Sequence, residues 1–357
     1  MKFLKIGLIG VLGFIIVLIG FVGVLTLLEY RPDDVEILEV TNEQTQQLSI
    51  GESFSLMTFN MGYAGLGKDE DFVMDGGKKG RPDSKAVVEG YLAGILDTLS
   101  EYPVDFYLLQ EVDLKARRSY HINQISEIAA HLGPNFGYSF AYNFKAPFVP
   151  FPLSLSDHIG YVESGITTYQ TFQTSEVQRY QFPGAFSWPL RVANLKRAMM
   201  VTTIPLTDSD KKLIVINLHM SAYDGDGSLR AQEMQMLKDM MISYREDGHY
   251  VIVGGDFNQT FPEAVDIYPV TQDFYVAYPI ESDWLPTGFS FEIDLNHPTC
   301  RLLNQPYDPS DGLTQYYIID GFIVSDNVEI VTQAQTLPLN FEHSDHNPVI
   351  IEVRLKP

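Results

Sequence analysis

The stretch Val251–Gln259, VIVGGDFNQ, constrains the fold of this chain more than any other. Three consecutive β-branched apolar residues predict a strand that is covered on both faces, because a half-exposed strand would alternate apolar with polar residues. Two glycines follow, and we expect them to let the backbone turn sharply above the strand end. Asp256 and Asn258 lie two positions apart, so an extended backbone points both side chains to one side. Such a pair can orient water, hold a metal ion or bind a phosphoryl oxygen, whereas the simpler interpretation is a turn capped by its own side chains.

A second constraint is an almost unbroken apolar run from Ile6 to Leu28, which follows Lys2 and Lys5. As a helix this run is long enough to cross a hydrocarbon core of about 30 Å. Lysines before the run and acids after it place the body of the protein outside the cell, by the positive-inside rule. We predict an uncleaved signal anchor over residues 1–28, because the apolar core of a cleavable signal peptide, the alternative, is shorter and precedes a small-residue cleavage site. The expected location is the cell membrane, in a single pass, with the body extracytoplasmic.

The composition of the chain indicates that the remainder is a packed globular protein. A polar, acidic tether over residues 29–49 is expected to precede one folded domain over residues 50–357. The 357 residues are 45% hydrophobic and carry a formal net charge of -22, so a DNA or RNA duplex is a disfavoured partner. The chain has one cysteine, which excludes an intrachain disulfide.

Strand and helix patterns alternate along the domain, which is typical of an α/β fold. We predict helices at 85–101, 120–132 and 228–244, and strands at 54–59, 104–109, 165–169, 176–180, 198–203, 213–217, 251–253, 316–319, 322–324 and 349–353. Two other segments have a functional and a structural interpretation. The basic cluster Lys78, Lys79 and Arg81 is either a phosphate contact or a solvated loop. The aromatic segment 143–155 is either an exposed loop near a membrane or apolar substrate, or part of the core.

Polar residues recur where the predicted strands end: Asn60, Glu111, His219, Asp256, Asn258, Asp320, Asp345 and His346. Carboxylate and amide oxygens suit Mg²⁺ or Mn²⁺, and histidines titrate near neutral pH. The amides of Asn60 and Asn258 can donate to an oxyanion. Together these groups are suited to metal-assisted attack of water on a phosphate ester.

The motifs that carry these residues resemble the endonuclease/exonuclease/phosphatase superfamily, which includes sphingomyelinase-like and deoxyribonuclease-like metal-dependent phosphoesterases. They are TFN (Thr58–Asn60), LLQEVD (Leu108–Asp113), NLHM (Asn217–Met220), GGDFN (Gly254–Asn258), IDGFIVS (Ile319–Ser325) and HSDHNPV (His343–Val349). The resemblance runs in family order from Ser53 to about Leu355. It implies a four-layer α/β/β/α sandwich of two packed mixed β-sheets, with the site at one edge.

The resemblance also implies a role for each of these residues. Glu111 corresponds to the metal ligand, with Asn60 beside it. Asp256 corresponds to the residue that orients or deprotonates the attacking water, and Asn258 binds phosphoryl oxygens.

The implied roles extend to two histidines and two further acids. His219 and His346 flank the phosphate, one stabilising charge and the other assisting proton transfer, in an order that the sequence leaves open. Asp320 and Asp345 orient the histidines, and Asp345 is also a candidate metal ligand. Arg118, in a segment similar to sphingomyelinase-like phosphodiesterases, is the first candidate for a substrate phosphate contact, and Arg301 is the second. A surface ion pair is the alternative for each arginine.

These observations predict a Mg²⁺-dependent phosphodiesterase or phosphatase on the outer membrane face, with Mn²⁺ as an alternative ion. A phosphate ester, either a lipid head group or another small ester, is the expected substrate. An extracellular nuclease acting on DNA or RNA is the alternative enzyme. A catalytically inactive surface binding module is a third interpretation, which the completeness of the residue set disfavours.

Overall fold

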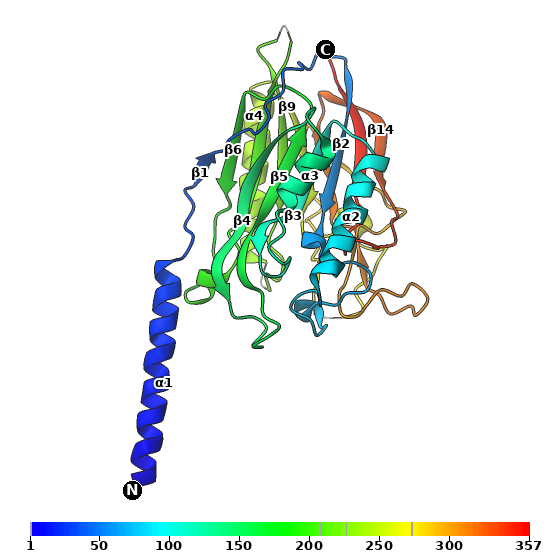
Figure 1. Ribbon diagram of the computed structural model, residues 1–357. Helices are drawn as coiled ribbons and strands as arrows, with labels where there is room; N and C mark the ends of the chain where they lie inside the picture. Colours follow the sequence, from blue (N-terminus) through cyan, green and yellow to red (C-terminus); the bar gives the residue numbers. More distant parts are fainter. Residues whose placement is uncertain (1, 208, 226, 273) are drawn as a thin grey trace.

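The β-strands form two sheets that pack face to face. The computed structural model describes residues 2–207, 209–225, 227–272 and 274–357 (Figure 1). Within these residues the first sheet has the order β1 (Val35–Ile37), β6 (Glu176–Gln181), β7 (Ala198–Pro205), β8 (Lys212–His219), β9 (Tyr250–Asp256), β13 (Asp320–Ser325) and β10 (Phe289–Glu292). The second has the order β14 (Val328–Thr336), β15 (Val349–Leu355), β2 (Ser53–Asn60), β3 (Phe106–Ala116), β5 (Gly160–Gln170) and β4 (Gly137–Val149). A separate short pair joins β11 (Cys300–Arg301) to β12 (Tyr316–Tyr317).

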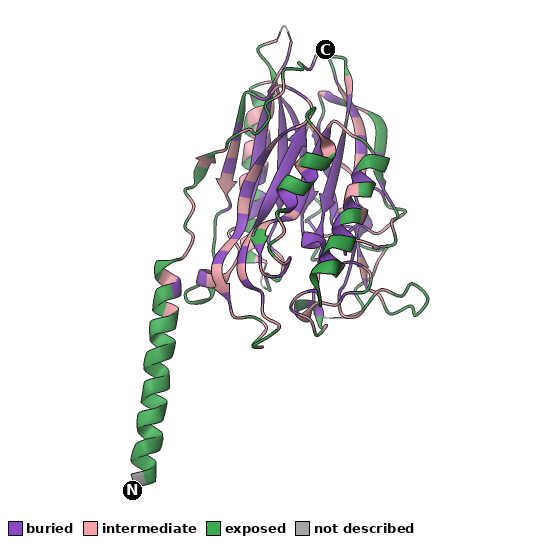
Figure 2. Cartoon of the chain, viewed as in Figure 1, coloured by how far each residue is buried: buried purple, intermediate pink, exposed green. Residues whose placement is uncertain are grey.

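Both sheets are mixed, because each contains one parallel pair among antiparallel ones. β8 runs parallel to β9 in the first sheet, and β2 runs parallel to β3 in the second. The inner faces of the two sheets share one apolar core, in which Phe54 and Leu108 meet Val215 and Ile252. Figure 2 shows the buried residues concentrated along these strands.

Helices cover the two outer faces. α2 (Lys85–Glu101) and α3 (Gln124–Leu132) pack on the six-stranded sheet, and α4 (Ser228–Glu246) packs on the other. α2 begins at Ser84, whose side chain accepts a hydrogen bond from the amide of Val87. Short 3₁₀ turns are η1 (Gly62–Ala64), η2 (Val73–Asp75), η3 (Leu190–Ala193) and η4 (Pro262–Ala264). The predicted fold of four layers, α/β/β/α, is therefore confirmed.

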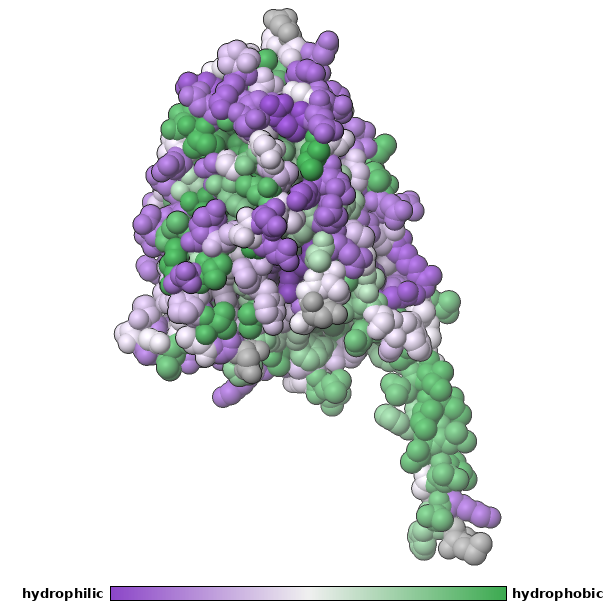
Figure 3. Space-filling view, turned by 180° about the vertical axis from the view of Figure 1, so that it is seen from behind, coloured by the Kyte–Doolittle hydropathy of each residue, from purple (hydrophilic) through white to green (hydrophobic). Residues whose placement is uncertain are grey.

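An N-terminal helix projects away from the sandwich. α1 (Lys2–Leu27) contains a segment, Phe3–Leu27, that is long and apolar enough to cross a membrane, and nearly all of it is exposed. Figure 3 shows this helix as a continuous hydrophobic column beside a body of mixed polarity. After it, β1 pairs with β6, so part of the predicted tether lies on the edge of a sheet.

Two details of the prediction were wrong. Gly254 and Gly255 lie inside β9 and make no turn. A strand was predicted at 316–319, but only Tyr316–Tyr317 (β12) is a strand there, and the long strand of that region is β13, which begins at Asp320. For segment 143–155 the structure favours the second interpretation in its first half, which belongs to β4, and only the connection after Val149 is a loop.

The glycine at position 255 of β9 is required because β8 and β9 approach each other closely, and not because the chain turns there. A β-carbon at Gly255 would lie 2.1 Å from the carbonyl oxygen of Leu218 on the neighbouring strand. The β8–β9 pair therefore closes only because position 255 has no side chain, and this pair carries the residues that end both strands.

We predict that Gly255→Ala destabilises the fold by about 2 kcal/mol or more, because β8 and β9 must separate to admit the methyl group. The matched control is Gly90→Ala in the exposed middle of α2, where a β-carbon meets nothing within 4 Å. That control should gain about 0.5–1 kcal/mol from the helix preference of alanine. Denaturant unfolding of the detergent-solubilised chain measures both, and equal effects would contradict the close-approach explanation.

Candidate active site

Three neighbouring strands bring their polar residues into a row. β8 and β9 end at His219 and Asp256, and the register places these two residues side by side. β13 runs the opposite way and begins at Asp320, which pairs with Asp256. The row His219, Asp256 and Asp320 is therefore a direct result of strand register.

The second sheet contributes the facing groups. Asn60 ends β2, and its Nδ2 donates to Oδ2 of Asp256 over 3.0 Å and lies 3.4 Å from Nε2 of His346. The side-chain oxygen of Asn60 accepts from the amide of Gly62, so this amide group is fixed at both ends. The edge where the sheets meet is called the rim below, and it comprises Asn60, Glu111, His219, Asp256, Asn258, Asp320, Asp345 and His346.

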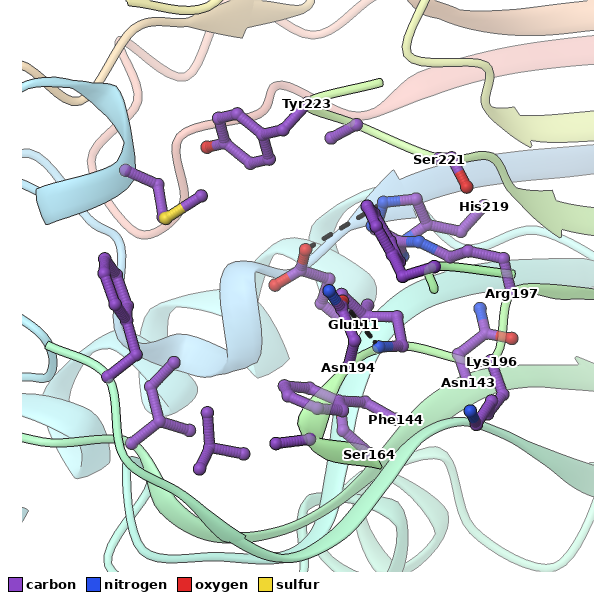
Figure 4. Close-up of a pocket in the computed structure, with 18 of the residues that line it drawn as sticks. Glu111, Asn143, Phe144, Ser164, Asn194, Lys196, Arg197, His219, Ser221 and Tyr223 are labelled. Atoms are coloured by element: carbon purple, nitrogen blue, oxygen red, sulfur yellow. Dashed lines mark hydrogen bonds and ion pairs between the residues drawn. The ribbon is translucent and has the colours of Figure 1, made fainter. Parts of the chain in front are cut away.

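Glu111 reaches the rim through a β-bulge. The pairing of β3 with β5 shifts between Leu109 and Val112, and Glu111 has a left-handed backbone with φ of 52°. Such a conformation is costly for a side chain larger than glycine and concentrates at functional sites. Its carboxylate Oε1 lies 3.9 Å from Nε2 of His219, as the dashed line in Figure 4 shows.

The two histidines have opposite electrostatic surroundings. Nδ1 of His346 contacts Oδ2 of Asp320 at 2.8 Å, which leaves Nε2 facing the rim. Burial alone would lower the pKa of His346, but the charge and hydrogen bond of Asp320 and the further charges of Cys300 and Asp345 together outweigh it and raise that pKa well above its ordinary value. Burial and the nearby charge of Arg197 lower the pKa of His219 well below its ordinary value. His346 is therefore set up as the cation and His219 as the neutral imidazole.

Two rim acids hold protons unusually well. Burial and the neighbouring Asp320 raise the pKa of Asp256 to about 7. Burial raises the pKa of Asp345 to about 7, and the charge of Glu111 adds to this effect. These are carboxylates that a cation at the rim would stabilise in the ionised form.

Asn258 is held in place by its neighbours. Its backbone amide donates to Oδ1 of Asp256 over 2.8 Å, and its side-chain nitrogen donates to the carbonyl of Met220 over 2.9 Å. The hydroxyl of Tyr275 donates to its side-chain oxygen over 2.7 Å. The amide therefore has one defined orientation at the rim.

In sequence comparisons, no family model and no curated protein matches this chain. Structural comparisons do find similar molecules. An endonuclease/exonuclease/phosphatase from Beutenbergia cavernae DSM 12333 matches with a TM-score of 0.59 and 15% identity, over 85% of this chain and 72% of its own. ANGEL2, described as a 2′,3′-cyclic phosphatase, matches with a TM-score of 0.55 and 13% identity, over 90% of this chain and 99% of its own. The catalytic domain of human Nocturnin matches with a TM-score of 0.51 and 14% identity, over 89% of this chain and 97% of its own.

This chain has the endonuclease/exonuclease/phosphatase fold. The resemblance carried by the six motifs is thereby confirmed at the level of the fold. The structure also brings together the eight rim residues that the motifs supplied, although their individual roles stay predictions.

The rim of this endonuclease/exonuclease/phosphatase fold fits a divalent metal ion. Asn60, Glu111 and Asp345, the predicted ligands, line one cavity and offer the oxygen donors that Mg²⁺ and Mn²⁺ prefer. A second group, Asp256, Asp320 and His346, has ligand atoms within 4.8 Å of one another. The first set is the predicted one, and the second set would have to accommodate the contact between Nδ1 of His346 and Asp320.

Both predicted phosphate-binding arginines line the cavity, and they differ in their partners. The guanidinium of Arg118 stacks 3.7 Å from the ring centre of Tyr63 and makes a bidentate pair with Asp113. The guanidinium of Arg301 donates to backbone carbonyls, including that of Gly67 over 2.8 Å. Arg118 is thus fixed by a carboxylate and Arg301 by loop carbonyls, and the phosphate contact of each stays a prediction.

Sequence reasoning missed Arg197, which precedes β7. Its side chain is buried in the cavity wall near Glu111 and His219, and within the described part of the chain its guanidinium makes no hydrogen bond (Figure 4). A buried cation without a partner is a better anion site than an engaged one. No local pattern marks it, because an arginine before a strand usually lies on the surface.

The basic cluster of the long loop does not reach the cavity among the described residues. Lys79 pairs with Glu70 at 2.9 Å and with Asp83 at 2.8 Å. Arg81 donates to the carbonyl of Ser156 over 3.3 Å. The structure therefore favours the interpretation of a surface loop.

We predict that the metal-free protein loses stability as pH rises through about 7, since both raised acids must then ionise while buried. In the unfolded chain these acids ionise near pH 4. Between about pH 4 and 7 the folded state therefore binds more protons than the unfolded state, and the stability that this gives is lost by the time the pH is above about 7. The measurement is the thermal midpoint in EDTA between about pH 6.5 and 8. The raised pKa of His346 lowers the midpoint over the same interval, so the comparison between variants isolates the contribution of the acids. Asp256→Asn should flatten the slope, and the exposed Asp266→Asn should not. A midpoint that rises with pH would contradict this assignment.

Proposed function

We propose that this protein is a divalent-metal-dependent phosphoester hydrolase. The observation that carries the proposal is the convergence of Asn60, Glu111, Asp256 and His346 at the rim of a cavity that also contains Arg197. Acids for a metal and for water, with cations for the phosphate, are the groups that this reaction requires. The similar fold of ANGEL2, described as a 2′,3′-cyclic phosphatase, supports the same reaction class.

Each rim residue then has a step that its surroundings suit. Asp256 orients a water molecule and accepts its proton, the water oxygen bonds to phosphorus, and the ester P–O bond breaks. The leaving alcohol takes up a proton as it departs. His346, held as a cation by Asp320, stabilises the charge on the phosphoryl oxygens, and neutral His219 serves proton transfer.

Glu111, Asn60 and Asp345 would hold the ion, which we propose to be Mg²⁺, or Mn²⁺ in its place. The ion supplies Lewis-acid polarisation of the phosphoryl oxygen and lowers the pKa of bound water. Arg118 and Arg197 contact the other phosphoryl oxygens from the cavity wall.

We place the reaction at the outer face of the cell membrane. The support is the apolar α1, with lysines before it and acids after it. A net charge of -22 disfavours a duplex as substrate, so a small phosphate ester, free or as a lipid head group, is the proposed substrate.

The test is hydrolysis by the full chain of 4-nitrophenyl phosphate, bis(4-nitrophenyl) phosphate and plasmid DNA, with Mg²⁺ or EDTA. We predict release of nitrophenolate from an ester only with the metal ion. Asp256→Asn and His346→Ala should each lower kcat by about a hundredfold or more, because each removes a group that acts in the transition state.

The matched controls are Asp266→Asn, at an exposed position, and His249→Ala, at the opposite end of β9. Both should keep the activity of the wild type. Full activity of both rim variants would sink the proposed site, and rapid EDTA-sensitive nicking of the plasmid would replace the small ester with a nucleic acid.

A further inference from the structure

The cavity at the rim does not end at the polar residues. It has a volume of about 1240 Å³, above the range of about 300–1,000 Å³ typical of small-molecule sites. Beyond Arg197 the apolar side chains of its wall include Val192 and Leu195 of the segment before β7, beside the paired charges of Arg191 and Lys196. The far wall is the last turns of α1, with Phe21 and Leu25. We call this apolar part the corridor.

The end of α1 is fixed to the body, so the corridor has a defined wall. The carboxylate of Glu29, just after the helix, is buried and pairs with Lys196 at 2.9 Å and Arg191 at 3.4 Å. The indole of Trp188 donates to the hydroxyl of Thr26 over 3.1 Å. Lys196 is adjacent to Arg197, so the same short segment contacts the helix and the rim.

The mouth of the corridor is bordered by apolar side chains that face outward. Leu153 is 94% exposed and Leu190 is 65% exposed, and both line the cavity. Trp188, two residues before Leu190 in the chain, is 57% exposed. In Figure 1 the loops at this end of the body lie on the side from which α1 projects, away from the C-terminus. Exposed apolar groups around a membrane helix are stable in lipid and unfavourable in water, and tryptophan is enriched at the interface between them.

We propose that the corridor binds a hydrocarbon chain of a phosphate ester carried by a membrane lipid, whose phosphate lies at the rim. We infer this occupant because one cavity joins two environments. One wall of the corridor is the helix proposed to lie among lipid chains, and the other end of the cavity holds the phosphate-binding groups. This proposal rests on the proposed hydrolase function and assigns the substrate class of the same site. It makes α1 part of the substrate site in addition to an anchor.

The test uses two substrates with the same reacting group, hexadecyl 4-nitrophenyl phosphate and methyl 4-nitrophenyl phosphate. The full chain is assayed in phosphatidylcholine nanodiscs with Mg²⁺, and the readout is the ratio of kcat/KM for the long ester to that for the short one. Ala193→Trp fills the corridor with bulk, and Leu190→Asp places a charge at its mouth. Partition of the long ester into the bilayer is the same for every variant. A change in the ratio of kcat/KM values therefore measures binding of the hydrocarbon chain in the corridor.

The wild type should prefer the long ester, and both variants should lower the ratio by about tenfold or more, since the lost burial of only two methylene groups is worth that much. Activity on the methyl ester should stay within about twofold, which shows that the variants fold. The matched control is Leu313→Asp, because Leu313 has the same 65% exposure as Leu190 and does not line the cavity. It should leave the ratio unchanged.

The two proposals fail in distinguishable ways. Hydrolysis of both esters with a ratio that neither variant changes would overturn the corridor and leave the hydrolase function standing. An equal fall of the ratio in Leu313→Asp would overturn it too, because the effect would then be one of surface charge. Hydrolysis of neither ester by a wild type that cleaves 4-nitrophenyl phosphate would overturn the corridor alone, and failure on all three esters would overturn both proposals.

Discussion

The alignment of His219, Asp256 and Asp320 across β8, β9 and β13 is the constraint on which the rest of the site depends. Strand register sets it, and register tolerates no small adjustment, because a slip of one residue would turn each side chain to the other face. The closeness of β8 and β9 in turn requires a glycine at position 255. The two sheets then have to pack so that Asn60 reaches Asp256, which the shared apolar core between them enforces.

Burial gives these groups their chemistry. An acid or imidazole in water has its ordinary pKa, but at the rim burial and neighbouring charges shift the pKa values of Asp256, Asp345, His219 and His346. The two histidines differ because the contact with Asp320 favours the cation of His346, whereas burial and the charge of Arg197 keep His219 neutral. A divalent ion among the acids would offset the negative charge of the ionised carboxylates.

The six motifs predicted the fold through the resemblance that they carry, and the eight rim residues could be named because polar residues at strand ends are local signals. The sequence also predicted α2 with its bounds, since that helix has a clear apolar stripe and a proline, Pro103, follows it. It could not predict what depends on distant packing. The bulge at Glu111, the burial of the Arg197 guanidinium in the cavity wall and the hydrogen bond from Tyr275 to Asn258 arise only once separate segments meet. Arg301 has the residue type of a phosphate contact, but loop carbonyls surround it in the fold.

The position of the metal ion tests the account most directly. A crystal of the full chain grown with Mn²⁺, measured at a wavelength where manganese scatters anomalously, would locate it. The account predicts one strong peak at bonding distance from the carboxylate of Glu111, with the contact between His346 and Asp320 intact. A peak between His346 and Asp320, or none along this edge of the sandwich, would contradict it.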